Sequence, residues 1–375
     1  MIEWVMFMKK FAETAAKVLK IAVLLAAAAF CMARTELVGA AVGEAVQRCL
    51  TTVIPSLYAM MIVSALIVRS GICGCIPRFA ARLSRRITGM DGTAAAIFAV
   101  GTFAGYPVGT SMLLSEFSQG RLTKRQTEIL SGLCFGAGPA FIFGCISGKL
   151  YSSSTAGIII ILSTAAANLI AMLLVSPILR RFKGSERSGE GVSLTAEMLT
   201  ESIVSSGAAL GKICFSVTAF AVISAFLTSL GISGAVGEGL SRVTGLDGRT
   251  CEQLFAAFLD VTNVSGLPRD DFALLPFVCG LTSFGGVCVM FQLGALIGKR
   301  ISMRILVGMR LFTGVISGVV CRVIMPWVMR NELVSAVRMN GVRVSREVSV
   351  VPSVMLGIMT VMVIGEYGKL KEKRK

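Results

Sequence analysis

The sequence lacks histidine altogether, and charged residues make up only 15% of its 375 positions. Histidine is the usual side chain for acid–base catalysis near neutral pH and the usual partner of cysteine in mixed metal sites. Soluble domains contain about 25% charged residues. No nucleotide-binding loop or metal-ligand spacing stands in for these groups. We therefore expect a protein that is neither soluble nor an enzyme and that has no resident cofactor.

What the sequence has in abundance is apolar and small residues. Apolar residues account for 54% of the chain, 40 residues are glycine, and the mean hydropathy is +0.78. Small side chains let helices approach closely in lipid, where no hydrophobic force drives helices together. The composition predicts one all-α bundle in a lipid bilayer.

The net charge is +16, from 37 basic and 21 acidic residues, which in a soluble protein would suggest nucleic-acid binding. The basic residues instead cluster between apolar runs, as in Arg78, Arg82, Arg85 and Arg86. Such clusters are typical of cytoplasmic loops of membrane proteins. We expect no nucleic-acid partner. The eleven cysteines lie mostly within apolar runs, where they are expected to act as small buried hydrophobes.

Apolar runs of about 20 residues predict membrane-spanning helices. About eight such helices are expected, at 21–33, 41–68, 129–148, 156–179, 208–230, 272–297, 305–328 and 350–365. The first is short and follows four lysines, as in a signal peptide, but we expect it to remain in the protein.

Two further apolar stretches, 93–114 and 250–268, are interrupted by Gly-Tyr-Pro and by Asn-Val-Ser-Gly-Leu-Pro. A backbone break at membrane depth is tolerated only where protein or a water-filled cavity satisfies the freed polar groups. Both stretches are predicted to be re-entrant hairpins.

The two halves of the chain repeat one another. Residues 83–92, LSRRITGMDG, match 240–248, LSRVTGLDG, with one residue deleted, and shorter matches before and after keep the same order. This predicts an N-terminal helix at 1–40, a gate-type repeat at 41–180, a cytoplasmic linker at 181–206, a second repeat at 207–328, and a C-terminal helix with a basic tail at 329–375.

Charge predicts how the two repeats are oriented. The loops 69–91 and 116–128 are basic and are expected inside, whereas the equivalent loops 231–248 and 267–271 are neutral to acidic. The second repeat would then be inverted relative to the first, with both termini in the cytoplasm. Inverted repeats with discontinuous elements are the architecture of secondary transporters.

Four glycine-rich or polar stretches interrupt the apolar sequence, at 101–110, 134–144, 259–266 and 283–292. The repeat pairs the first with the third and the second with the fourth, so all four are expected to meet near the middle of the membrane. Helix ends at these breaks would present unpaired N–H and C=O groups to a polar or anionic solute. The expected solute-binding residues are Gly105, Tyr106, Pro107, Gly109, Gly138, Pro139, Thr262, Asn263, Phe284, Gly285, Gly286 and Gln292.

Asp260 is a carboxylate in an apolar stretch, which costs about 2.5–3.5 kcal/mol at the bilayer centre and needs a partner or a role. We expect it to bind a coupling cation, sodium or a proton, or to cap a helix. Several other candidates have structural alternatives: Thr262 and Asn263 as caps, Tyr106 as an interface anchor, Gln292 as a bond to another helix, and the glycines as turn residues.

The four stretches resemble the signature of the YlbJ-like sporulation integral membrane protein family, in the nucleoside recognition or gate domain group. The resemblance covers roughly residues 45–330. The residues that match the family pattern are Gly105-Tyr106-Pro107 with Gly109, Gly138-Pro139, Thr262-Asn263, Phe284-Gly285-Gly286 and Gln292. Three positions differ from the pattern. Residues 135–137 are Phe-Gly-Ala where the pattern has Asn-Asn-Ser, residue 260 is Asp where it has Glu, and residue 290 is Met where it has His.

The resemblance implies a fold similar to concentrative nucleoside transporters and a bacterial cell-membrane location, with the outer forespore membrane as the specific case. It also implies transport of dipicolinate during sporulation. A nucleoside transporter and a non-transporting membrane scaffold of sporulation are the alternatives. A homo-oligomer is left open.

Overall fold

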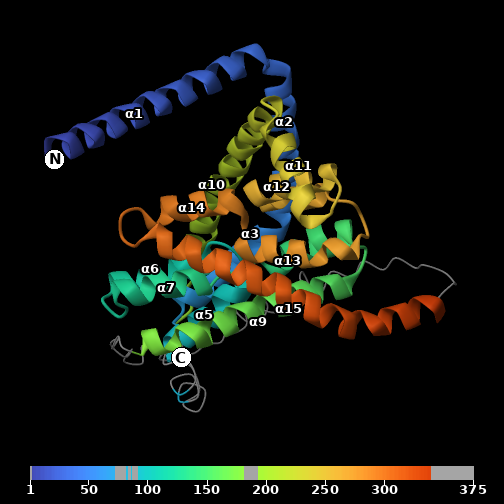
Figure 1. Cartoon of the computed structure of the whole chain (residues 1–375). Helices are drawn as coiled ribbons and strands as arrows, with labels where there is room; N and C mark the ends of the chain where they lie inside the picture. Colours follow the sequence, from blue (N-terminus) through green and yellow to red (C-terminus); the bar gives the residue numbers. More distant parts are fainter. Residues whose placement is uncertain (1, 72–81, 83–85, 87–91, 181–192, 339–375) are drawn as a thin grey trace. The chain divides into compact units, whose positions relative to one another are not determined.

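The computed structural model describes residues 2–71, 82, 86, 92–180 and 193–338, and all regular structure in these ranges is helical (Figure 1). The chain forms two units, Met1–Met329 and Arg330–Lys375. The predicted helix at 350–365, the basic tail and most of the loop 69–91 lie outside the described residues.

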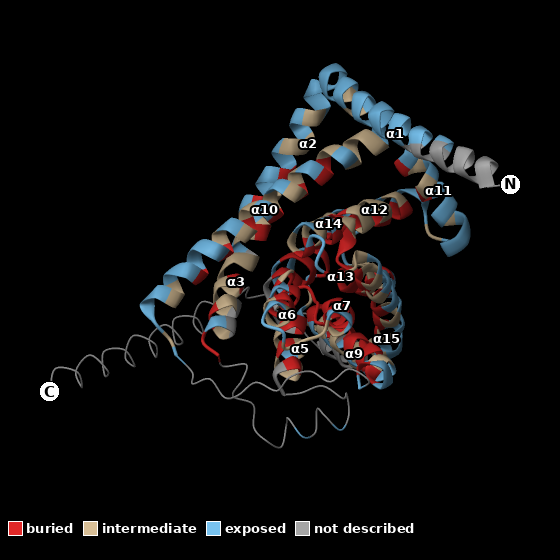
Figure 2. Cartoon of the chain, turned by 90° about the vertical axis from the view of Figure 1, so that its left-hand side faces the viewer, coloured by how far each residue is buried: buried red, intermediate tan, exposed pale blue. Residues whose placement is uncertain are grey.

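The N-terminal part begins with α1 (Ile2–Ala33) and α2 (Thr35–Arg48). A π-helical turn, η1 (Cys49–Val53), joins α2 to α3 (Ile54–Arg69), so the predicted span at 41–68 is helical throughout. The helix changes direction by 93° between residues 17–33 and 35–53. Figure 2 shows that α1 is exposed along its described length.

The first predicted broken element is broken where the sequence places it. α5 (Gly92–Ala104) ends before a turn at 105–107, and α6 (Val108–Ser118) follows. The next predicted span, 129–148, is also discontinuous: α7 (Lys124–Leu133) ends, and the chain resumes helix at α8 (Pro139–Phe141) and the π-helix η3 (Ile142–Leu150). α9 (Ser154–Leu179) then forms a long apolar helix.

The second half begins with α10 (Ala196–Ser229), which starts inside the predicted linker, and α11 (Ile232–Thr244). α12 (Gly248–Leu259) ends at Asp260 and is followed by two 3-10 turns, η4 (Val261–Gly266) and η5 (Phe272–Leu274). α13 (Leu275–Phe284), α14 (Gly286–Ile297) and α15 (Met303–Arg338) complete the described chain.

Four stretches of the described chain are long and apolar enough to cross a membrane, 154–179, 196–229, 272–297 and 303–329, and a fifth arises if the bent pair at 17–53 is one span. Large apolar side chains on these helices are exposed, such as Phe215 at 78% and Val315 at 69%. Their exposure suits contact with lipid chains. The protein is therefore an all-α integral membrane protein with four to five candidate spans. The other predicted spans in the described ranges, 41–68 and 129–148, are assembled from shorter helical pieces.

The main core lies among α8, η3, α9, α12, α13, α14 and α15, with Tyr106 from the α5–α6 turn at its centre. Glycines set the spacing where α13 crosses α15. A Cβ on Gly280 would lie 3.2 Å from the carbonyl oxygen of Gly314, and one on Gly314 would lie 3.1 Å from that of Gly280. The two backbones are in contact, as is typical of helix pairs in membranes. Figure 2 shows α13 as one of the buried elements.

Candidate functional site

The turn between α5 and α6 packs directly on the break after α7. A Cβ on Gly105, whose φ is +91°, would lie 3.3 Å from Gly138, and a Cβ on Gly109 would overlap the carbonyl oxygen of Cys134. On the other face of this contact, a Cβ on Gly136 would overlap the carbonyl oxygen of Thr102. Glycine is required because the two backbones touch. The structure thus brings 101–110 and 134–138 together, as the sequence predicts.

The break between α13 and α14 packs in the same way on the end of α12. Gly286 has a φ of +83°, and a Cβ there would lie 2.9 Å from the backbone nitrogen of Val261 and 3.5 Å from Asp260 Cα. At Gly285, with a φ of +92°, a Cβ would lie 3.0 Å from the ring of Phe135 and 3.3 Å from that of Tyr106. All four interrupted stretches therefore meet in one region.

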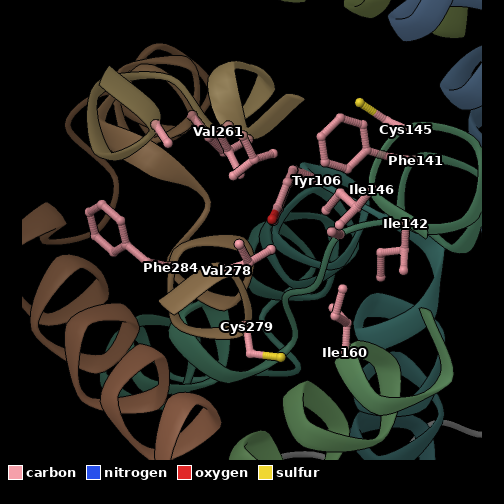
Figure 3. Close-up of a cluster of buried hydrophobic side chains, with 14 of the residues drawn as sticks. Tyr106, Phe141, Ile142, Cys145, Ile146, Ile160, Val261, Val278, Cys279 and Phe284 are labelled. Atoms are coloured by element: carbon pink, nitrogen blue, oxygen red, sulfur yellow. The ribbon is translucent and has the colours of Figure 1, made fainter. Parts of the chain in front are cut away.

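Tyr106 connects the two pairs of breaks. Its hydroxyl donates to the backbone carbonyl of Thr282, and its ring centroid is 4.4 Å from that of Phe135. Figure 3 shows Tyr106 in the middle of the core cluster, between Val261 and Phe141. Because Tyr106 is only 8% exposed, its position argues against the interface-anchor interpretation.

Asp260 is buried, at 3% exposure, where α12 stops. Its Oδ1 accepts the backbone N–H of Thr262 at 3.0 Å and so caps η4. The structure contains the predicted capping geometry and buries it within the protein. A buried carboxylate needs compensation beyond one backbone donor.

A positive charge reaches this end of α12 from Arg48, which is not among the predicted site residues. The guanidinium of Arg48, at the end of α2, donates to Oδ1 of Asn263, and the Asn263 amide donates to the backbone carbonyl of Ala256 at 3.1 Å. Asn263 therefore links α2 to the broken end of α12.

Asp260 lines a small cavity of about 40 Å³, together with Tyr106, Gly138, Thr262 and Gln292. This volume holds about two or three water molecules. The remaining wall is apolar, from residues such as Val53, Leu57, Phe141, Ile213, Val217, Val261 and Val289. Five predicted site residues, including Asp260, therefore line this one cavity.

The other predicted residues support this region without lining the small cavity. Gly109, Gly285 and Gly286 provide the close backbone contacts described above, and Pro107, Pro139 and Phe284 flank the breaks. Gln292 donates to Cys288 Sγ at 3.4 Å within its own helix, so the predicted bond to another helix is not what the structure shows.

A second missed residue is Arg310, which is 0% exposed in α15. Its guanidinium donates to the carbonyl of Gly132 at 2.9 Å, to Asn168 Oδ1 at 3.1 Å and to the carbonyl of Ser283. Its Cζ also lies 4.3 Å from the centroid of the Phe135 ring. Gly132 and Ser283 are in the last turns of α7 and α13, where carbonyls are unpaired and carry partial negative charge. Arg310 thus holds both helix breaks in place.

A charged residue inside an apolar run is the sequence signal that would have found both arginines. Arg48 lies within the predicted span 41–68 and Arg310 within 305–328. Neither arginine is among the predicted site residues, because both lie in apolar runs outside the four interrupted stretches.

No family model, no curated protein and no solved structure matches the chain.

Proposed function

We propose that the protein is a secondary carrier that moves a small polar or anionic solute across a bilayer. The single observation that supports this most is the meeting of four interrupted stretches, from distant parts of the sequence, around the buried carboxylate of Asp260. Discontinuous elements that meet beside a buried ionisable group are typical of carrier binding sites.

The architecture that we propose is two inverted repeats with about eight spans and two re-entrant hairpins, at 93–114 and 250–268. The order of elements supports it. α7 and α13 contain ten residues each, each is followed by a break, and each break is followed by a second helical piece, at 139–150 and at 286–297. The long helices α9 and α15 then follow at equivalent places. Inversion would place 69–91, 116–128 and both termini in the cytoplasm.

A membrane scaffold is the competing proposal. A scaffold has no physical reason to keep a carboxylate at 3% exposure beside an internal cavity, because burying a charge without a role lowers stability. In a carrier the buried carboxylate of Asp260 has a role that offsets its cost in stability, because a coupling cation, sodium or a proton, would bind there.

The first solute to test is dipicolinate, because the resemblance to the YlbJ-like sporulation family implies its transport. The same resemblance implies a location in the bacterial cell membrane, specifically the outer forespore membrane. Nucleosides come second, since the gate domain group includes similarity to concentrative nucleoside transporters. The test is flux of dipicolinate and uridine into proteoliposomes that contain the purified protein, compared with empty liposomes and with Asp260→Asn. Uptake of either solute above both controls supports the carrier, and no flux of either solute supports the scaffold.

A further inference from the structure

A second cavity adjoins the small one and has a different character. It measures about 290 Å³ and shares Val53 and Thr262 with the small cavity. Its wall comes from the end of α2, from η1, η3 and η4, and eight of its ten lining residues have polar side chains. We refer to this space, lined among others by Glu44, Arg48, Thr52, Lys149, Thr262 and Ser265, as the polar cavity.

Two of its lining residues are cations that lack a carboxylate partner. Arg48 donates to the neutral amide oxygen of Asn263, and Lys149 Nζ donates to the hydroxyl of Thr52 at 3.0 Å. Neither cation is within 4 Å of an acidic side chain anywhere in the described ranges. Glu44 is the single acidic residue in the wall of the polar cavity. The cavity therefore carries an excess of positive charge.

Unused hydrogen-bonding capacity points to the same cavity. Arg48 Nε and Thr262 Oγ1 are both buried without a hydrogen-bond partner among the described residues. A buried donor or acceptor that stays unpaired costs about 1–3 kcal/mol, so such groups usually mark a place where a ligand or water completes the bonding. Both residues line the polar cavity, and Thr262 also faces the small cavity.

We propose that the polar cavity binds a small organic carboxylate, whose oxygens pair with Arg48 and Lys149 and accept a hydrogen bond from Thr262. The planar guanidinium of Arg48 matches a carboxylate, and charge-assisted bonds of this kind are the strongest available in a protein. A volume of about 290 Å³ lies at the lower end of small-molecule sites, which suits an acid of a few carbon atoms.

Asp260 lies one step deeper, in a cavity of only about 40 Å³, where a carboxylate ligand would find neither room nor a favourable charge. The anion therefore stops at the polar cavity, and the small cavity is left for water or the coupling cation. This inference rests on the proposed function, because it names the class of solute that the carrier recognises.

The test is calorimetric titration of the full chain in nanodiscs of phosphatidylcholine, with succinate, inorganic phosphate and uridine as probes. We expect succinate to bind, and Arg48→Met or Lys149→Gln to weaken its binding by about tenfold to a hundredfold, the range for one charge-assisted bond. Arg48→Lys should bind more tightly than Arg48→Met because it keeps the charge.

Matched controls come from the same chain. Lys299 is exposed and stands at the position equivalent to Lys149 in the repeat, and Arg242 is exposed on α11. Lys299→Gln and Arg242→Gln remove the same charges away from the cavity and should leave succinate binding unchanged. Thermal unfolding midpoints of all variants check that they are folded.

The inference is overturned by no succinate binding to the wild type, by an equal loss in the Lys299→Gln control, or by tighter binding of phosphate than of succinate. Replacing phosphatidylcholine by phosphatidylglycerol tests an anionic lipid headgroup as the occupant, and full competition by this lipid would also contradict a soluble acid.

Flux without carboxylate binding would reject this inference and keep the carrier, whereas binding without flux would reject the carrier and keep the anion site.

Discussion

Arg310 of α15 donates from its guanidinium to the side-chain oxygen of Asn168 in α9, at 3.1 Å. α9 and α15 occupy equivalent places in the two proposed repeats, so this bond joins the halves of the molecule. The Asn168 amide also donates to the backbone carbonyl of Phe135 at 2.7 Å, so Asn168 connects Arg310 to the segment after α7. The break after α7 is therefore held by residues from both long helices.

Arg310→Met should destabilise the protein strongly. It would leave the carbonyl oxygens of Gly132 and Ser283 buried without this donor, at a cost of about 1–3 kcal/mol each. Arg310→Lys should cost less, because lysine keeps the charge but not the planar fork. The midpoint of thermal unfolding in detergent measures both. Arg322→Met is the control, since Arg322 is exposed on the same helix and should change stability by less than about 0.5 kcal/mol. An unfolding midpoint equal to that of the wild type in Arg310→Met would show that Arg310 does not hold the two helix breaks in place.

Gly136→Ala should lower stability by about 1–3 kcal/mol, the usual cost of inserting a methyl group into a packed interior. The added Cβ would overlap the carbonyl oxygen of Thr102, and a backbone carbonyl cannot rotate away as a side chain can. Gly144→Ala serves as the control, because no atom lies within 4 Å of a Cβ at Gly144. Helix propensity favours alanine there by up to about 1 kcal/mol. Equal unfolding midpoints for the two variants would show that α5 and the break after α7 are not in contact.

Asp260→Asn should abolish flux while the protein remains folded and inserted. Asparagine caps a helix about as well as aspartate and keeps the oxygen that accepts the Thr262 N–H, so a loss of flux would not reflect a lost cap. Insertion should become easier by up to about 3 kcal/mol, because a buried charge is removed. If Asp260 holds the coupling cation, the ion dependence of flux should disappear as well. Full flux with unchanged ion dependence would assign Asp260 the capping role alone.

Asn263→Ala should also abolish flux, since it frees the guanidinium of Arg48 and the carbonyl of Ala256 from their partner. Its effect should exceed that of Ser216→Ala, in which the lost bond is a local one to the carbonyl of Lys212 and the residue lines neither cavity. Proteoliposome flux at matched protein content compares the two variants. An equal, small effect in both would show that the Arg48–Asn263 contact plays no part in transport.

The proposed topology predicts that native Cys73 and a cysteine introduced at Gln119 are labelled from the cytoplasmic side, and one at Glu238 from the outside. Each position is tested with Cys31 and Cys75 changed to serine in all three variants, and with Cys73 also changed to serine in the two variants that carry an introduced cysteine. A membrane-impermeant maleimide applied to intact cells and to inverted vesicles reads the side. Labelling of positions 73 and 119 from opposite sides would remove the first re-entrant hairpin, and with it the inverted repeat.

The sequence by itself determined that this is an all-α membrane protein and where its helices are interrupted. An apolar composition places the chain in lipid, and glycine or proline in an apolar run interrupts a helix, so the turn at 105–107 was predictable. The second interruption was predicted at 263–268, but α12 already ends at Leu259, ahead of the glycine and proline. The close approach of 101–110 to 134–138 followed from the repeat and from the glycines.

Only the tertiary structure decided what the polar side chains do. Arg48 and Arg310 lie in uninterrupted apolar runs, and their partners are 215 and up to 178 residues away, at Asn263 and Gly132. No local pattern encodes such a distance, because hydrogen bonds across helices depend on crossing geometry and not on spacing along the chain. Tyr106 was ambiguous for the same reason: an amphipathic ring suits a membrane interface and a protein interior equally, and its burial against Phe135 is fixed by the packing of helices far apart in the sequence.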